Sequence, residues 1–139
     1  MKIAVRYYTK SGNTKKVAET IASKLRVEAY DLSEEVSEDT DILFLGSSLY
    51  AFDIEASVKD YISKLDKGKI QTVALFGTSA ITKSGNRKME KLVLSKGIPV
   101  VPQYYHCKGE FKGINKGRPN ENDLEDARKF ADSVIEKLK

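Results

Sequence analysis

A short polar turn, Thr9-Lys10-Ser11-Gly12-Asn13-Thr14, stands between an apolar run and a stretch of helical periodicity. The start of a helix carries unpaired N–H donors and the positive end of the helix dipole, so such a turn can bind an anion. Gly12 would let the backbone approach that anion closely, and Thr14 would reach it with a hydroxyl. We interpret residues 9–14 as a phosphate-binding turn. The alternative is a hydroxyl-rich helix cap without a ligand.

Two common nucleotide-binding motifs do not describe this turn. A Walker A loop needs Lys followed by Ser or Thr after its second glycine, and that pair is missing here. The dinucleotide motif needs three spaced glycines, whereas Gly12 stands alone. The turn therefore belongs to a different kind of phosphate site.

Apolar runs alternate with helical patterns along the whole chain, which predicts a parallel sheet covered by helices on both faces. The predicted strands are 2–8, 26–31, 41–47, 71–77 and 98–106. The predicted helices are 14–25, 54–65, 85–96 and 121–138. Residues 32–40 are acidic and turn-like, so we expect a loop or a single helical turn there.

The 139 residues form one predicted α/β domain, with the five strands in the order 2-1-3-4-5. Ligands of such sheets bind beyond the carboxyl ends of the strands, where the winding reverses. In this order the reversal lies between the first and third strands. The polar turn at 9–14 and the segment that follows Leu45 should therefore meet at one pocket.

The turn resembles the phosphate loop of flavodoxins, whose pattern is S/T-x-S/T-G-N-T, at every specified position: Thr9, Ser11, Gly12, Asn13 and Thr14. The resemblance covers nearly the whole chain and implies a three-layer flavodoxin-like sandwich that binds FMN. It also implies an electron-transfer protein that meets a reductase and an acceptor, both redox proteins. The alternative within the same superfamily is an FMN-dependent oxidoreductase of the quinone- or protoporphyrinogen-linked type. Against it, no long basic and aromatic insertion follows the fourth strand.

Two further segments would surround the flavin ring if the resemblance holds. The first follows the third strand and comprises Ser47, Ser48, Leu49, Tyr50, Ala51 and Phe52. Tyr50 is the stronger candidate to stack on the ring, because flavodoxins often place an aromatic there, whereas Phe52 could equally cover the second helix. The second segment, Gly77, Thr78 and Ser79, follows the fourth strand and would form a backbone-lined rim.

A receiver-type signalling domain shares the same strand order but needs different residues. It requires acidic residues after the first strand and an aspartate after the third. Residues 7–10 contain no acid, and Ser47 and Ser48 stand where the aspartate would be. We reject that class.

Three departures from the flavodoxin pattern affect the predicted site. Ala51 stands where many flavodoxins have a glycine, and no aromatic lies between Gly77 and the third helix. Arg6 lies inside the first strand, where the family is apolar, so its charge needs a partner or a route to the sheet edge.

Composition limits the other classes. The net charge is +4, but 24 basic residues are interspersed with 20 acidic ones and no nucleic-acid motif is present. No apolar run approaches a membrane span, and the start of the chain lacks the pattern of a signal peptide. A single cysteine is consistent with a reducing compartment. We expect a cytoplasmic monomer without a metal site.

The segment after the fifth strand offers two weaker signals. His106 and Cys107 are adjacent, so on a strand they would point to opposite faces, and we interpret both as structural. Cys107 near a flavin could alternatively be sensitive to oxidation. The basic residues Lys108, Lys112, Lys116 and Arg118 could dock an acidic redox partner, although a solvated loop would look the same.

Overall fold

The computed structural model describes residues 1–36, 38–50, 53–81 and 85–139, with the backbone alone for Tyr50. Five parallel strands form its sheet: β1 (Ile3–Tyr8), β2 (Ala29–Asp31), β3 (Ile42–Tyr50), β5 (Val73–Ser79) and β6 (Tyr105–Lys108). Their spatial order is β2-β1-β3-β5-β6, and a two-residue strand, β4 (Asp53–Ile54), pairs antiparallel with β3. The order among the parallel strands confirms the predicted 2-1-3-4-5 arrangement.

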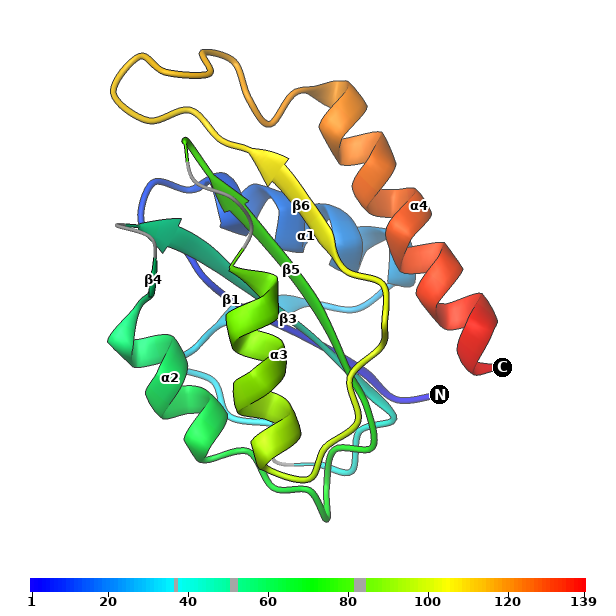
Figure 1. Cartoon of the computed structure of the whole chain (residues 1–139). Coiled ribbons are helices and arrows are strands. Elements are labelled where there is room, and N and C mark those ends of the chain that lie inside the picture. The colour runs from blue at the N-terminus through cyan, green and yellow to red at the C-terminus, as the bar shows by residue number, and fades with distance from the viewer. Residues whose placement is uncertain (37, 51–52, 82–84) are drawn as a thin grey trace.

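Two pairs of helices cover the sheet and make it the middle of three layers (Figure 1). Residues of α1 (Asn13–Leu25) and α4 (Glu121–Leu138) share a buried cluster with one face of the strands. Residues of α2 (Ala56–Ser63) and α3 (Asn86–Ser95) belong to the cluster on the other face. The predicted three-layer sandwich is therefore confirmed.

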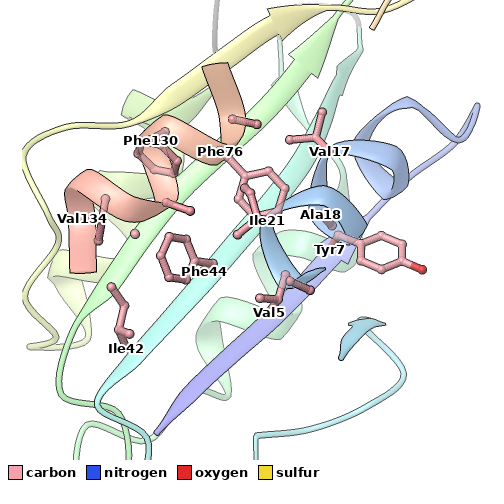
Figure 2. Packing of buried hydrophobic residues seen from close by; sticks show 14 of the residues in the cluster. Val5, Tyr7, Val17, Ala18, Ile21, Ile42, Phe44, Phe76, Phe130 and Val134 are labelled. Atoms are coloured by element: carbon pink, nitrogen blue, oxygen red, sulfur yellow. The ribbon is translucent and has the colours of Figure 1, made fainter. Parts of the chain in front are cut away.

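Successive side chains of the strands point to opposite faces of the sheet, so the strands contribute to the hydrophobic cluster on each face. Val5, Phe44 and Phe76 belong to the cluster beneath α1 and α4, and Figure 2 shows their side chains together with those of Phe130 and Val134. The rings of Phe44 and Phe130 meet edge to face at 6.0 Å and 87°. Neighbouring strand residues belong to the opposite cluster. Because both faces are covered, consecutive residues in the first parts of β3 (42–45) and β5 (73–76) are all apolar and buried.

The fifth strand of the sheet is shorter and later than predicted. We expected residues 98–106, but β6 runs from Tyr105 to Lys108, and Val100 makes only an isolated bridge to Val73. Pro99 and Pro102 carry no N–H, so they cannot donate to a continuous ladder. Strand β4 was not predicted, because two residues carry too little pattern to be recognised.

The connection from β2 to β3 contains no helix in its described residues, 32–36 and 38–41, as the sequence predicted. Arg6 holds this connector. Its Nε donates to the carbonyl of Glu34 at 3.0 Å, its Nη2 donates to that of Glu35 at 3.2 Å, and its guanidinium stacks on Tyr30. The Tyr61 hydroxyl of α2 donates to the same Glu34 carbonyl at 2.8 Å. Two of the carbonyls that accept from Arg6 thus lie 28 and 29 residues away, and its Nη1 also donates to the Val5 carbonyl at 3.0 Å.

A hollow of about 850 Å³ lies beside this connector and α2. Its walls include Leu32, Val36, Tyr61 and Leu65, and Thr9 also belongs to the lining.

Both ends of the chain lie at the end of the sheet opposite the 9–14 turn (Figure 1). Among the helices of the described residues, none combines the length and the apolar character that a membrane crossing requires.

Candidate functional site

The three predicted site segments meet at the carboxyl edge of the sheet. β1 pairs with β3 so that Tyr8 lies beside Ser47, and β3 pairs with β5 so that Ser47 lies beside Gly77. The parallel register brings together loops that are far apart in sequence. The hydroxyl groups of Ser48 and Thr78 also occupy neighbouring positions, one strand apart.

The 9–14 turn has an open backbone at Gly12, in a left-handed conformation that glycine adopts without strain. Its φ is +93°, and a Cβ placed there would meet no atom within 4 Å. The Gly12 N–H donates to Thr9 Oγ1 at 3.0 Å, which closes the turn, and α1 begins with the bond from Lys16 N–H to the Gly12 carbonyl. Lys10, Ser11 and Gly12 are exposed. The turn therefore presents backbone to solvent at the start of a 13-residue helix.

Three helices begin at this edge without a side-chain cap in the described residues. The N-caps of α1, α2 and α3 are Gly12, Glu55 and Gly85, and none of their side chains bonds the helix start. In contrast, Asn120 and Asp123 form a complete capping box on α4. Uncapped N–H groups and aligned dipoles make the edge electropositive, which favours an anionic ligand.

Thr14 faces into the fold rather than outward. It is fully buried, and its hydroxyl lies 2.7 Å from Ser48 Oγ and 2.8 Å from Thr78 Oγ1. This hydroxyl cluster, Thr14–Ser48–Thr78, joins the start of α1 to the ends of β3 and β5. The geometry assigns Thr14 to holding the turn in place, and direct contact with a phosphate stays a prediction.

The other residues predicted for the site lie partly at the carboxyl edge of the sheet and partly in the hydrophobic core. Ser47 is buried and donates to the Ser48 carbonyl at 2.9 Å, while Leu49 packs into the α2–α3 core. At Gly77 the strands are close, because a Cβ there would lie 2.7 Å from the Ser47 carbonyl oxygen. The side chain of Tyr50 and all of Ala51 and Phe52 lie outside the described residues.

Ser79, at the end of β5, pairs with the histidine of β6. Its Oγ lies 2.8 Å from His106 Nε2. Burial, and secondarily Lys108, holds the pKa of His106 below its usual range, which favours the neutral ring. Burial raises the pKa of the Cys107 thiol to about 11. In the described part of the chain, no group of three or more His, Cys, Asp or Glu side chains could hold a metal ion.

The sequence did not reveal that the β6–α4 loop, residues 109–119, belongs to this site. Asn13 Nδ2 donates to the Glu110 carbonyl at 2.9 Å and to Ser11 Oγ at 3.1 Å. Asn115 Nδ2 donates to the Ala80 carbonyl at 2.6 Å. A Cβ at Gly109 would overlap the Asn13 carboxamide. Glycine and asparagine suit any loop, so no sequence signal identified these contacts in advance.

Comparison with known proteins agrees with this geometry. A family model described as flavodoxin domain matches residues 4–110. An uncharacterized protein of Methanocaldococcus jannaschii is 29% identical, over 88% of this chain and 90% of its own.

Two solved structures share the fold over nearly their full length. A flavodoxin from the domain Archaea has a TM-score of 0.83 at 19% identity and covers 99% of both chains. Oxidised flavodoxin 2 from Bacillus cereus has a TM-score of 0.75 at 22% identity, also over 99% of both chains. The switch-point turn, the strand order and the match over 4–110 lead to one conclusion: this chain belongs to the flavodoxin domain family.

Proposed function

We propose that this protein binds FMN and carries electrons between redox proteins, as a cytoplasmic carrier. The observation that supports this most is the exposed 9–14 turn. It has a left-handed Gly12, no side-chain cap on α1 in the described residues, and a position at the switch point of a parallel sheet.

In this proposal the phosphate binds to the backbone N–H groups at the start of α1 and to the hydroxyls of Thr9 and Ser11. The donor set fits a phosphate because it combines neutral hydrogen-bond donors with a helix dipole. Lys10 adds a positive charge at the exposed turn. The hydroxyl cluster beneath the turn would keep these donors in position.

The ring of the cofactor would lie between the segments at 47–52 and 77–79. Tyr50 is proposed to cover one face of it, with Phe52 as the second candidate. FMN supplies one- and two-electron transfer when bound, and the protein supplies binding, orientation and electrostatics.

The first test compares two glycines of similar backbone geometry. Gly12 and Gly97 have φ values of +93° and +79°. A Cβ at Gly12 meets nothing within 4 Å, and at Gly97, which follows the end of α3, it makes only ordinary contact with the Lys67 side chain at 3.4 Å. Gly12→Ala and Gly97→Ala should therefore each strain the backbone by about 1–2 kcal/mol. Only Gly12→Ala should weaken FMN binding, by roughly tenfold or more in a flavin-fluorescence titration, since that strain is felt at the bound phosphate.

Riboflavin, which lacks the phosphate, provides the second arm. Its affinity should change little in Gly12→Ala. Equal losses of FMN and riboflavin would show that the turn does not hold the phosphate, and absence of a flavin absorbance spectrum after reconstitution with FMN would overturn the proposal itself.

Once FMN is bound, experiments can distinguish an electron carrier from an enzyme that oxidises a substrate. A carrier should exchange electrons with one-electron acceptors and show no quinone turnover beyond that of free FMN. Sustained quinone reduction driven by a nicotinamide donor, well above the free-FMN rate, would favour the oxidoreductase alternative.

A further inference from the structure

The β6–α4 loop and the strand before it present lysines at the edge of the proposed cofactor site. Lys112 and Lys116 are exposed and Lys108 is half-buried. Glu110 is the only acid in residues 108–118, and its Oε1 accepts from the Gly117 N–H at 2.9 Å. This surface therefore has a clear excess of positive charge.

A hollow of about 480 Å³ separates this loop from the phosphate turn. Lys16, Lys112 and Arg118 line it, with Glu110 as the single acidic residue in the lining. Arg118 is already paired with Asp123, at 2.6 and 2.8 Å. Lys16 Nζ donates to the Pro119 carbonyl at 3.1 Å. Lys16 of α1 and Lys112 of the loop both line the hollow, so a carboxylate entering it would come near two positive charges.

The loop is braced, so it presents these charges on a fixed frame. Glu110 N–H donates to the Arg118 carbonyl at 2.8 Å, and Phe111 and Ile114 exchange backbone hydrogen bonds at 3.0 Å. The bonds from Asn13 and Asn115 described above attach the loop to the phosphate turn and to the end of β5. A preformed surface loses little conformational freedom on binding, which favours association.

Apolar side chains stand among the lysines. Ile114 is 42% exposed, and Ile81, on the adjoining turn after β5, is 70% exposed. The Asn115–Ala80 hydrogen bond holds these two turns together. An apolar centre with a charged rim is the usual composition of a protein–protein interface.

One group of acidic residues lies at the opposite edge of the sheet. The connector between β2 and β3 lies toward the β2 edge of the sheet, whereas the β6–α4 loop follows β6, the opposite edge. In residues 31–41 the connector carries six acids and no basic residue: Asp31, Glu34, Glu35, Glu38, Asp39 and Asp41. The β2 edge is therefore acidic where the β6–α4 loop is basic, and this difference can orient an approaching partner. Acids also follow the loop at the start of α4, where Asp123 is paired with Arg118, and Glu121 and Glu125 are paired with Arg128.

We propose that the basic face, defined as Lys16, Lys108, Lys112 and Lys116 with Ile81 and Ile114, docks an acidic redox protein beside the cofactor edge. The proposal rests on the proposed electron-carrier function, because it names the class of partner. Carboxylates of that partner would enter the hollow and meet the lysines. The apolar centre would then exclude water close to the site of electron exchange.

The experiment uses an acidic plant-type [2Fe–2S] ferredoxin as the partner and a basic c-type cytochrome as its counterpart. Binding of ferredoxin to the protein as purified is measured first, by NMR line broadening at low and high salt. Transfer from reduced ferredoxin to the FMN-loaded protein is then measured by stopped flow at saturating FMN. Ferredoxin binding should weaken and the rate of electron transfer should fall as salt rises, because salt screens the electrostatic attraction between the two proteins.

Two double variants provide the matched comparison. Lys112→Glu/Lys116→Glu alters the basic face, while Lys67→Glu/Lys91→Glu alters exposed lysines elsewhere, and each lowers the net charge from +4 to zero. The basic-face variant should slow ferredoxin transfer by about tenfold or more at low salt, within the range of electrostatic steering. The control variant should stay within about twofold of the unaltered protein.

Equal losses in both variants would overturn the proposal, because they would trace the effect to net charge alone. The proposal would also be overturned if electron transfer from reduced ferredoxin to the protein did not slow as salt rises, while transfer from the reduced protein to the oxidised basic cytochrome did. If FMN does not bind, the binding arm still decides: ferredoxin should broaden the resonances of the basic face in the apo protein, and its failure to do so would refute docking independently of the cofactor.

Discussion

At the scale of single residues, Thr14 connects three elements through one hydroxyl. A threonine hydroxyl has one proton and two lone pairs, so it can take part in both bonds of the cluster. The cluster is fully buried at Thr14 and nearly so at Ser48 and Thr78. Buried hydroxyls left without partners are costly, so the three groups depend on one another.

Replacing Thr14 tests this dependence. Thr14→Val keeps the shape but removes the hydroxyl, which deprives Ser48 and Thr78 of a partner. The free energy of unfolding should fall by about 1–3 kcal/mol in a urea titration. Thr20→Val is the matched control, since the Thr20 hydroxyl bonds the Lys16 carbonyl on the surface of the same helix. A loss no larger than in the control would show that the cluster contributes nothing to stability.

The cysteine gives a second prediction at this scale. Burial raises the pKa of Cys107 to about 11, so at pH 8 roughly one thiol in a thousand is ionised, compared with about a quarter for a cysteine of pKa 8.5. Its side chain is also shielded, with the residue only 6% exposed. A thiol reagent such as Ellman's reagent should react far more slowly with native than with urea-unfolded protein. Equal rates would restore the redox-sensitive interpretation of Cys107.

At the scale of elements, α4 depends on an ion pair at its first turn. Asp123 accepts from the Asn120 N–H and receives two bonds from Arg118. The Arg118 guanidinium holds the pKa of the Asp123 carboxyl below its usual range. The ion pair stabilises the folded state while Asp123 is charged, above the pKa of the unfolded chain, and this stabilisation is lost as pH falls through the lower folded-state value.

Asp123→Asn should therefore cost about 1–3 kcal/mol of unfolding free energy at pH 7, and the difference from the unaltered protein should shrink by pH 2.5. Urea titrations at both pH values measure it. Asp126→Asn, at an exposed position of the same helix, serves as the control. A pH-independent difference would mean that Asp123 acts through its capping geometry alone.

The bounds of the helices and strands show which elements can be predicted from the sequence and which cannot. The helices and four of the five parallel strands were placed close to their observed bounds, because each carries a strong apolar period or run. The fifth strand was misplaced because valines around Pro99 and Pro102 resemble a strand, while the proline nitrogens prevent a ladder. Of the site, the meeting of the 9–14 turn with the ends of β3 and β5 could be predicted from the strand order, while phosphate binding by the turn stays a prediction.

Contacts that depend on tertiary structure could not be predicted. Arg6 binds carbonyls of Glu34 and Glu35, and Asn13 binds the carbonyl of Glu110, 97 residues away. Backbone carbonyls occur at every position, so a side chain that seeks one leaves no pairing signal in the sequence. The direction of the Thr14 hydroxyl could not be predicted either. A threonine at this position is compatible with a hydroxyl that faces a ligand and with one that faces the core.

At the scale of the whole molecule, binding of FMN should raise the free energy of unfolding and the Tm. A ligand that binds only the folded state adds about 2.7 kcal/mol at a concentration of 100 Kd. For a chain of 139 residues this corresponds to a rise in Tm of roughly 10 °C. FMN should produce this shift in differential scanning fluorimetry or calorimetry, and riboflavin at the same concentration a smaller one. An unchanged Tm at FMN concentrations up to the millimolar range would contradict tight binding.

The position of the chain ends has a practical consequence. Both lie at the end of the sheet opposite the 9–14 turn (Figure 1). A peptide tag or anchor fused at Lys139 would therefore attach the protein to a gold or carbon electrode with its carboxyl edge toward the solution. When the protein is immobilised in that orientation, its basic face stays accessible to soluble partners. Voltammetry could then measure electron exchange with partners that bind at this edge alone.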